Sequence, residues 1–223
     1  MSRAQARIER SFARSLGFRG LYAVTPDEPD TEVLTHKVRK ALAGGAHIVQ
    51  YRNKSANARL RLEQGAELLA LCRTAGVPLI VNDDLDLALA IGADGLHLGR
   101  GDTALATART KLGEHRLLGA SCYDRLELAL AACSAGADYV AFGSAFPSAT
   151  KPGATPAPLG LYREARVLLD SPIVAIGGIT PENARTVIEA GADAVAVISA
   201  LFDAPDIEAA ARRFERLFRK KER

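Results

Sequence analysis

Two apolar runs near the middle of the chain each end in a carboxylate. The first run finishes at Asn82-Asp83, and the second finishes, one helix length later, at Asp102. If both runs are parallel strands joined by a right-handed crossover, their carboxyl ends are neighbours at one edge of the sheet. Asp83 and Asp102 would then converge on one point. Oxygen ligands of this kind favour magnesium over zinc, although helix capping or a surface salt bridge would also use such residues.

A unit of one strand-like run and one helix-like segment recurs along the chain. The runs that predict strands are 20–25, 47–52, 78–83, 94–99, 116–121, 138–143, 172–178 and 194–199. The segments with helical periodicity are 31–44, 57–75, 84–91, 103–113, 124–135, 159–169, 180–190 and 205–219. Several of these segments end in Ala-Gly-Ala-Asp or Ile-Gly-Ala-Asp, where a left-handed glycine can end a helix. In a chain of 223 residues this alternation predicts an α/β fold, a single-domain (β/α)8 TIM barrel over residues 20–223.

An additional helix is predicted before the barrel. Ile8, Phe12 and Leu16 form one apolar stripe within residues 1–19. We interpret this segment as an N-terminal helical extension that covers the amino-terminal end of the barrel.

The connections that follow the strands differ in composition from those that precede them. Segments after strands are polar and rich in glycine, whereas those before strands are short and have no distinctive motif. Catalytic residues of TIM barrels lie at the carboxyl ends of the strands. The asymmetry therefore predicts one functional face.

Polar side chains alternate at the end of the second predicted strand. Gln50, Arg52 and Lys54 are two residues apart, so they would project to one side of an extended chain. Two cations and an amide entering the barrel mouth together would suit a phosphorylated ligand with a hydrogen-bonding ring. The alternative is an exposed strand end whose charges lie in water.

Two further loops on the same face could bind anions. Ser148, Thr150 and Lys151 lie between proline and glycine after the sixth strand, where the loop could close over a substrate or be a plain surface loop. Gly177-Gly178 and Ile198-Ser199 follow the seventh and eighth strands, whose loops commonly bind phosphate in TIM barrels. Tight turns that require glycine are the alternative explanation for the second pair of loops.

Composition and charge exclude several other classes of protein. The net charge is +3, and acidic residues interrupt the basic residues near both ends, which indicates solvated helix faces and no nucleic-acid partner. The three cysteines lack the spacing of a disulfide framework or a zinc site. We find no signal peptide and no run of about 20 apolar residues, so we expect a soluble cytoplasmic protein without a membrane partner. His97 lies inside an apolar run and is interpreted as a packed core histidine.

Six motifs in sequence order resemble thiamine-phosphate synthases. They are VQYRNK, VNDDLDLALAIGADGLHLG with Asp102, GAS, FPSATKPG, VAIGGI and AVAVIS, which together span about residues 20 to 202. The resemblance implies a transferase of thiamine biosynthesis on a TIM barrel. It implies two phosphorylated small-molecule substrates, 4-amino-2-methyl-5-pyrimidinylmethyl diphosphate and a thiazole phosphate with or without a carboxylate. The implied products are thiamine phosphate and pyrophosphate, and the implied cofactor is Mg²⁺. A homo-oligomer is compatible with the resemblance.

The resemblance also implies a role for individual residues. Asp83 and Asp102 would bind the metal, and the catalytic set would be Arg52, Lys54, Ser121 and Lys151. The pyrimidine diphosphate would contact Gln50, Tyr51, Arg52, Asn53, Lys54, Asn82, Ser121 and Lys151, with the Tyr51 side chain facing away from the ligand. The thiazole phosphate would contact Ser148, Ala149, Thr150, Gly178, Ile198 and Ser199. In the implied mechanism pyrophosphate departs first, and the thiazole nitrogen then attacks the resulting cation without a general base.

The chain departs from the usual family pattern at a few positions. Asn53 replaces a common glutamate, Ser148 a common threonine, and Cys122-Tyr123 a threonine or alanine followed by histidine. Two other functions are compatible with part of the motifs. A thiazole tautomerase of the same superfamily would not need the two aspartates and the two lysines. A non-catalytic protein that binds thiamine phosphate would keep the ligand contacts but show no turnover.

Overall fold

Eight parallel strands close into a barrel in the computed structural model, which describes residues 18–147 and 155–219. The strands are β1 (Gly20–Val24), β2 (Ala46–Tyr51), β3 (Leu79–Asn82), β4 (Gly95–Leu98), β5 (Leu117–Tyr123), β6 (Tyr139–Phe142), β7 (Ile173–Ile176) and β8 (Ala194–Val197). Each strand pairs with the next one in the sequence, and β8 closes the ring against β1, as with Tyr22 opposite Ala196. The TIM barrel predicted from the sequence is confirmed, and all eight strands lie within or next to their predicted ranges.

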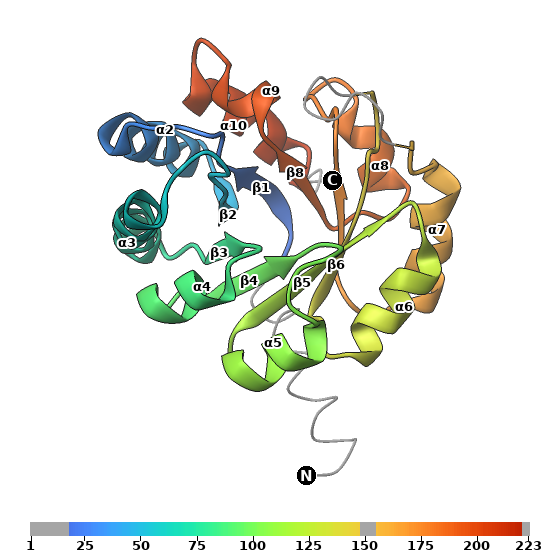
Figure 1. The fold of residues 1–223 in the computed structure, drawn as a ribbon. Helices are drawn as coiled ribbons and strands as arrows, with labels where there is room; N and C mark the ends of the chain where they lie inside the picture. The colour runs from blue at the N-terminus through green and yellow to red at the C-terminus, as the bar shows by residue number, and fades with distance from the viewer. Residues whose placement is uncertain (1–17, 148–154, 220–223) are drawn as a thin grey trace.

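Helices surround the strands on the outside of the barrel (Figure 1). They are α2 (Thr31–Ala43), α3 (Ala58–Ala75), α4 (Leu85–Ile91), α5 (Leu105–Leu112), α6 (Leu126–Ser134), α7 (Leu159–Leu168), α8 (Ala184–Glu189), α9 (Ser199–Phe202) and α10 (Ile207–Arg216). The short helix α9 was not predicted, because residues 194–199 were assigned to the last strand. Helix α8 begins at Ala184, later than the predicted residue 180, because Asn183 accepts a hydrogen bond from the Thr180 N–H and holds the preceding loop.

The Gly-Ala-Asp signatures explain how the chain passes from helix to strand. Gly92 has a φ of 70°, and it ends α4 in the left-handed conformation expected from the sequence. The aspartate two residues later, Asp94, accepts a hydrogen bond from the Leu79 N–H at 2.9 Å. Asp193 does the same for Ile173 at 2.8 Å. The glycine therefore stops the helix, and the aspartate ties the start of the next strand to its neighbour.

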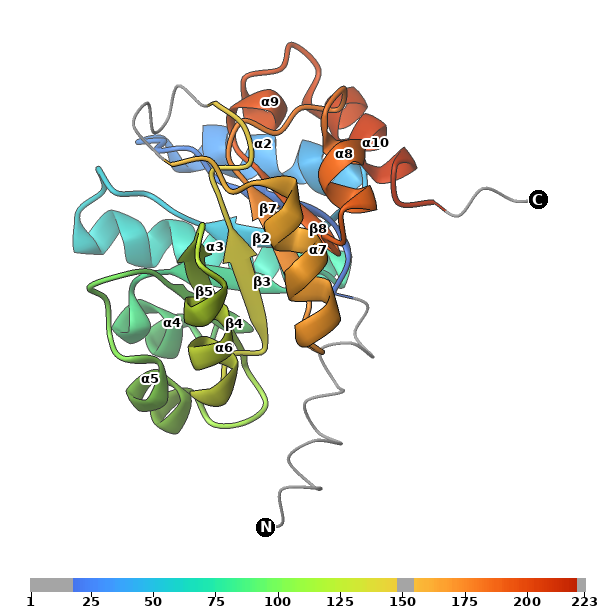
Figure 2. The same ribbon diagram turned by 90° about the vertical axis from the view of Figure 1, so that its right-hand side faces the viewer.

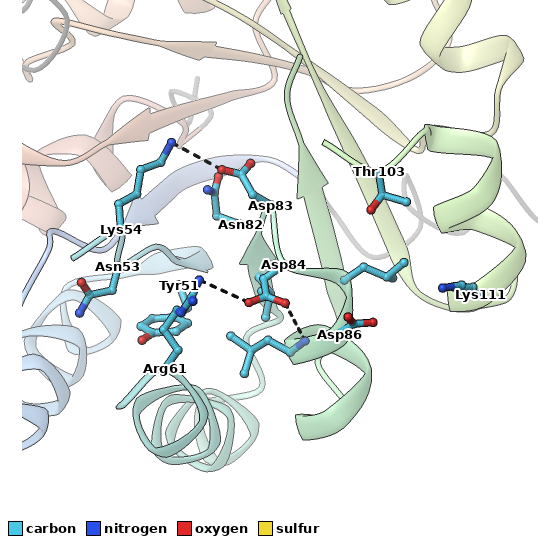
Figure 3. A pocket seen from close by; sticks show the side chains of 13 residues that line it. Tyr51, Asn53, Lys54, Arg61, Asn82, Asp83, Asp84, Asp86, Thr103 and Lys111 are labelled. Atoms are coloured by element: carbon cyan, nitrogen blue, oxygen red, sulfur yellow. Dashed lines mark hydrogen bonds and ion pairs between the residues drawn. The ribbon is translucent and has the colours of Figure 1, made fainter. Parts of the chain in front are cut away.

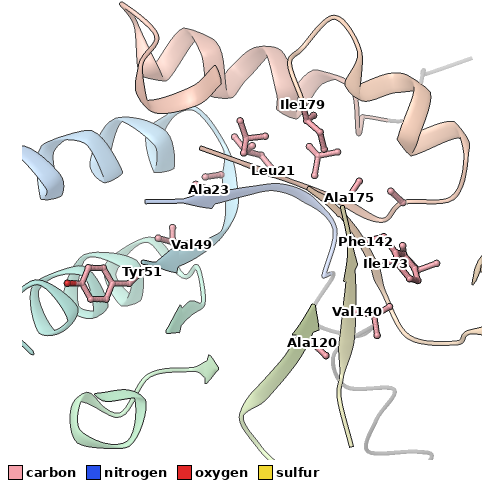
Figure 4. Packing of buried hydrophobic residues seen from close by; sticks show 14 of the residues in the cluster. Leu21, Ala23, Val49, Tyr51, Ala120, Val140, Phe142, Ile173, Ala175 and Ile179 are labelled. Carbon is pink, nitrogen blue, oxygen red and sulfur yellow. The ribbon is translucent and has the colours of Figure 1, made fainter. Parts of the chain in front are cut away.

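Two apolar layers stabilise the barrel. Alternate residues of each strand, such as Val49 and Tyr51, point outward and pack against the helices (Figure 4). The other set points to the barrel axis, where Phe18, Tyr22 and Tyr139 form part of a separate buried cluster. The inner layer makes the barrel a packed core, so ligands can enter only at its ends.

The carboxyl ends of the strands gather at one end of the barrel. In Figure 2 strand β6 points toward this end, where α9 also lies. The predicted extension over residues 1–19 lies almost entirely outside the described residues, which begin at Phe18. No helix in the described part of the chain is long and apolar enough to cross a membrane.

Candidate active site

Asp83 and Asp102 meet at the carboxyl ends of β3 and β4, as expected from the sequence. Burial raises the pKa of Asp83, and a hydrogen bond and charge repulsion from Asp102 raise it further. The Asp83 backbone has a φ of 63°, a left-handed conformation that is uncommon outside glycine. Its N–H donates to the His97 carbonyl oxygen at 2.8 Å, which holds this turn across the two strands. The structure thus brings the two carboxylates together and keeps them there with a constrained backbone.

The donor set of this carboxylate pair fits a magnesium ion. Magnesium is commonly held by one or two carboxylates, with waters and substrate phosphates completing the shell. Burial, together with charge repulsion from Asp102, raises the pKa of Asp83, and a divalent cation at this pair would counter both effects. In residues 18–147 and 155–219 no group of three or more His, Cys, Asp and Glu side chains could hold a metal.

The side chains of Gln50, Arg52 and Lys54 take three different places at the same end of the barrel. Gln50 is buried at 5% exposure and donates its Nε2 hydrogen to the Tyr22 hydroxyl, inside the barrel. Lys54 Nζ lies 3.6 Å from Asp83 Oδ2 at the mouth. Arg52 pairs instead with Asp27 at 3.0 Å.

Thr25 and Asp27 organise the loop that carries these cations, although the sequence analysis did not single them out. The Thr25 hydroxyl accepts a hydrogen bond from the Arg52 N–H and donates to the Arg52 carbonyl oxygen, both at 2.8 Å. Asp27 Oδ1 also accepts from the Lys54 N–H at 2.8 Å. These contacts between the ends of β1 and β2 set the direction in which Arg52 and Lys54 leave the barrel.

Tyr51 and Asn53, the intervening residues, face the outer layer. The Tyr51 ring lies beside α3 (Figure 4), where its hydroxyl donates to Gln64 Oε1 at 2.9 Å. Asn53 donates to the same Gln64 oxygen at 3.0 Å and to the Glu28 carbonyl oxygen at 2.8 Å. The Tyr51 side chain therefore faces away from the axis, as expected, and the Asn53 amide is engaged by the protein.

A cavity of about 400 Å³ opens beside the carboxylate pair (Figure 3). Lys54, Asn82 and Asp83 line one part of it, and Figure 3 shows the Lys54 ammonium directed toward Asp83. Asn82 also hydrogen-bonds Asp83, which lowers the pKa of that carboxyl. On the far side of the cavity Arg61 lies 3.5 Å from Asp84. The predicted pyrimidine contact Asn82 is thus next to the predicted metal ligand.

A second cavity, of about 640 Å³, opens between β5 and β8 on the same end of the barrel. The expected ligand-binding residues along its wall are Ser121, Gly178, Ile198 and Ser199. A Cβ atom on Gly178 would lie 2.4 Å from the Pro147 carbonyl oxygen, and the residue has a φ of 63°. Glycine is required there by both space and backbone conformation. Ser148, Ala149, Thr150 and Lys151 lie outside the described residues.

His97 joins Ser121 to tyrosines inside the barrel. Its Nε2 lies 2.9 Å from the Ser121 hydroxyl, and its Nδ1 lies 3.0 Å from the Tyr139 hydroxyl. Burial lowers the pKa of His97 from 6.5 to about 4. The interpretation as a packed core histidine is confirmed, since only 7% of the residue is exposed. The sequence analysis missed Tyr139 and Tyr22, because an aromatic residue in an apolar strand resembles ordinary core.

Tyr123, a departure from the usual family pattern, supports the loop that carries Asp102. Its hydroxyl accepts a hydrogen bond from the Arg100 N–H at 2.9 Å, and the Arg100 guanidinium lies 4.8 Å from the ring centroid. Asp102 Oδ2 accepts from the Gly99 N–H at 2.6 Å. Tyr123 and Arg100 both line the larger cavity, so this stacked pair is part of its wall.

This end of the barrel carries groups suited to anions and groups suited to a divalent cation side by side. Lys54 and the carboxylate pair lie on one side, and the glycine loop with Ser199 lies on the other. The Ser121 hydroxyl lines the larger cavity, and the Gln50 amide is buried inside the barrel. The arrangement suits two phosphorylated ligands that meet over the barrel axis.

Comparison with known proteins gives one consistent family. The family described as thiamine monophosphate synthase matches residues 21–201. A thiamine-phosphate synthase of Aromatoleum aromaticum is 56% identical over 200 residues, which are 90% of this chain and 96% of the relative. One of Chromobacterium violaceum is 58% identical over 193 residues, 86% of this chain and 93% of the relative. Among solved structures, the thiamine phosphate pyrophosphorylase from Pyrococcus furiosus has a TM-score of 0.82 and 37% identity, covering 91% of this chain and 96% of its own.

Proposed function

Because this chain belongs to the thiamine monophosphate synthase family and is an enzyme that forms thiamine phosphate, we propose the substrates and the mechanism by which it does so. The first substrate is 4-amino-2-methyl-5-pyrimidinylmethyl diphosphate, and the second is a thiazole phosphate. The pyrimidine methylene is transferred to the thiazole nitrogen, and pyrophosphate is released. The family places the reaction in thiamine biosynthesis and among the transferases.

The observation that carries this proposal is the pairing of Asp83 with Asp102 beside Lys54. Burial raises the pKa of Asp83, the hydrogen bond and charge repulsion from Asp102 raise it further, and Lys54 lowers it. A carboxylate pair next to a lysine would suit a magnesium ion held beside a diphosphate. We therefore assign Mg²⁺ as the cofactor, with Asp83 and Asp102 as its protein ligands. When bound, the metal supplies positive charge to the leaving diphosphate.

The remaining residues are assigned to two neighbouring ligands. Gln50 and Asn82 hold the aminopyrimidine ring, and the diphosphate is bound by Arg52, Lys54, Ser121 and Lys151. Tyr51 and Asn53 contribute to the binding of this ligand indirectly. Their side chains contact Gln64 and hold the end of β2 in place. The thiazole phosphate is bound by Ser148, Ala149, Thr150, Gly178, Ile198 and Ser199. The placement of Gly178, Ile198 and Ser199 around the larger cavity supports the second group.

The mechanism is a dissociative transfer. The bond between the methylene carbon and the diphosphate oxygen breaks first, and its electron pair leaves with pyrophosphate. Lys54 and Ser121 stabilise the developing charge on that oxygen. The aminopyrimidine ring delocalises the positive charge on the methylene. The lone pair of the thiazole nitrogen then forms the new carbon–nitrogen bond, so no side chain has to remove a proton.

A cytoplasmic location is part of the proposal and is supported by two buried thiols. Cys72 and Cys122 are free and buried, and burial raises the pKa of each thiol to about 12. Such thiols react slowly with oxidants and do not need a disulfide partner. Free cysteines without disulfide partners are typical of proteins in a reducing compartment.

The proposal is tested by the coupling reaction with and without magnesium. Wild type should form thiamine phosphate only with the metal, and Asp83→Asn should lose about a hundredfold in rate. Asp84→Asn is the matched control, because Asp84 is the adjacent residue, caps α4 and faces Arg61. Equal product with and without magnesium would overturn the metal assignment. No product under any condition would favour a tautomerase or a non-catalytic binding protein.

A further inference from the structure

Polar side chains from five strands form one continuous hydrogen-bonded chain across the barrel interior. Gln50 Nε2 donates to the Tyr22 hydroxyl at 2.8 Å, and the Tyr22 hydroxyl lies 2.9 Å from that of Tyr139. The Tyr139 hydroxyl lies 3.0 Å from His97 Nδ1, and His97 Nε2 lies 2.9 Å from the Ser121 hydroxyl. Gln50, Tyr22, Tyr139 and His97 are each at most 7% exposed. This hydrogen-bonded chain therefore links the two ends of the proposed pyrimidine diphosphate site through groups that are largely buried.

The direction of the first hydrogen bond determines the direction of the others. Each hydroxyl has a single hydrogen to donate. Tyr22 receives a hydrogen from Gln50, so it donates its own to Tyr139, its other partner in the chain. Tyr139 then donates to His97 Nδ1. If Tyr139 donated to Tyr22 instead, the Tyr22 hydrogen would have no acceptor within the chain, which is costly in a buried site.

The same direction decides what His97 and Ser121 can do. Both ring nitrogens of His97 face neutral hydroxyls and not a carboxylate, which suits a neutral ring. Because Nδ1 accepts from Tyr139, the ring hydrogen lies on Nε2 and is donated to Ser121. The hydroxyl hydrogen of Ser121 is then available to the larger cavity, whose wall Ser121 forms. At the other end of the chain Gln50 keeps its amide oxygen as an acceptor.

The opposite direction would give the site the wrong hydrogen-bonding groups. With the Gln50 amide turned around, its oxygen would accept from Tyr22, and each later bond would reverse. Ser121 would then donate to His97 and present only lone pairs to an anion. Gln50 would present N–H hydrogens to the amino group of the pyrimidine, which is itself a donor.

We propose that Tyr22 and Tyr139 are positioning residues that keep all the hydrogen bonds of this hydrogen-bonded chain in one direction. Gln50 is then the acceptor at one end, and Ser121 is the donor at the other. The chemical identity of the two ligands, an aminopyrimidine and a diphosphate, rests on the proposed function. Phe18 takes part as well, since its ring stacks on Tyr139 with centroids 4.4 Å apart. The stack holds the Tyr139 hydroxyl within reach of both Tyr22 and His97.

The first test reads the His97 tautomer by ¹⁵N NMR, with His97→Gln used to assign its signal among the four histidines of the chain. Wild type should carry the hydrogen on Nε2. Tyr139→Phe should lose this single tautomer. Tyr162→Phe is the matched control, because its buried hydroxyl donates to the Phe142 carbonyl oxygen at 3.1 Å in the outer layer. A wild-type ring with its hydrogen on Nδ1 would overturn the proposal.

The second test separates the two ends of the chain. Tyr139→Phe should bind inorganic pyrophosphate with magnesium about tenfold more weakly, whereas Tyr162→Phe should bind it as wild type does. Tyr22→Phe should keep the His97 tautomer, because Tyr139 still has His97 Nδ1 as an acceptor. It should raise KM for the pyrimidine diphosphate about tenfold, because the Gln50 amide is no longer held. Wild-type pyrophosphate affinity in Tyr139→Phe would contradict the proposal. Failure of the proposed function would appear separately, as absence of turnover in wild type.

Discussion

Lys54 Nζ lies 3.6 Å from Asp83 Oδ2, across the gap between the ends of β2 and β3. The side chains are 61% and 33% exposed, so water screens the pair and it adds little to stability. Its effect is on the site, because the ammonium lowers the pKa of a carboxyl that Asp102 and burial raise. The same ammonium remains accessible to an anion in the neighbouring cavity.

Replacing Lys54 should therefore affect turnover far more than folding. Lys54→Met is expected to slow thiamine phosphate formation about a hundredfold, roughly 3 kcal/mol of lost transition-state stabilisation. The free energy of unfolding should change by less than about 1 kcal/mol. Steady-state rates and thermal unfolding measure the two effects. Lys40→Met is the control, because Lys40 pairs with Glu208 at 3.7 Å on the outside of the barrel.

Magnesium should stabilise the protein in a manner that depends on pH. The raised pKa of Asp83 means that its ionised form is disfavoured without the metal, and this cost appears as the pH rises through that pKa. Magnesium removes the cost, so its effect on Tm should be larger near pH 8 than near pH 4. Protein treated with EDTA and titrated with magnesium provides the measurement. Asp83→Asn should show no such gain, and an undiminished gain would exclude Asp83 as a ligand.

His97 should make the fold less stable in acid. Its pKa is lowered to about 4 by burial, so the unfolded chain takes up a proton at higher pH than the folded one. Its contribution is complete above about pH 6.5 and is lost as the pH falls toward 4, up to about 3 kcal/mol. Urea unfolding across this pH range should show the loss in wild type, whereas the free energy of unfolding of His97→Gln should depend less steeply on pH. His36→Gln, at an exposed position of α2, should keep the wild-type dependence on pH.

A methyl group at Gly178 should damage the thiazole phosphate site. Its Cβ would meet the Pro147 carbonyl oxygen at 2.4 Å, and its φ of 63° disfavours alanine. Gly178→Ala should raise KM for the thiazole phosphate at least tenfold and cost about 1 kcal/mol or more of stability. Gly160→Ala in α7 is the control, because nothing lies within 4 Å of its Cβ position. That control should raise stability by up to about 1 kcal/mol.

Lys151 should act on turnover more than on binding. As a ligand of the leaving diphosphate, it is expected to stabilise charge that develops only in the transition state. Lys151→Ala should therefore slow turnover about a hundredfold, with a smaller loss of affinity for the thiazole phosphate. Single-turnover rates and equilibrium binding of the thiazole phosphate measure the two effects. Equal losses would place Lys151 in the thiazole phosphate site.

The sequence by itself determined the barrel and the end of it at which Asp83 and Asp102 meet. Alternating apolar runs and helical segments can bury their surfaces in few ways, and parallel strands place their carboxyl ends on one rim. Asp83 and Asp102 were predicted to meet for this reason, and the hydrogen bond between their side chains confirms it. The role of the glycine in each Gly-Ala-Asp signature could be predicted as well, because only glycine readily takes the left-handed backbone conformation.

Only the tertiary structure decided which polar groups meet inside the barrel. Tyr22 and Tyr139 lie far apart in sequence, and each resembles an ordinary core residue of an apolar strand. Their hydroxyls meet at 2.9 Å because the closed ring of strands turns both toward one axis. Asp27 likewise shows its role only when β1 lies against β2 and brings it to Arg52 and Lys54. The periodicity and composition of the sequence describe the two faces of a single strand. These contacts depend instead on the register between strands, which is set only when the barrel closes.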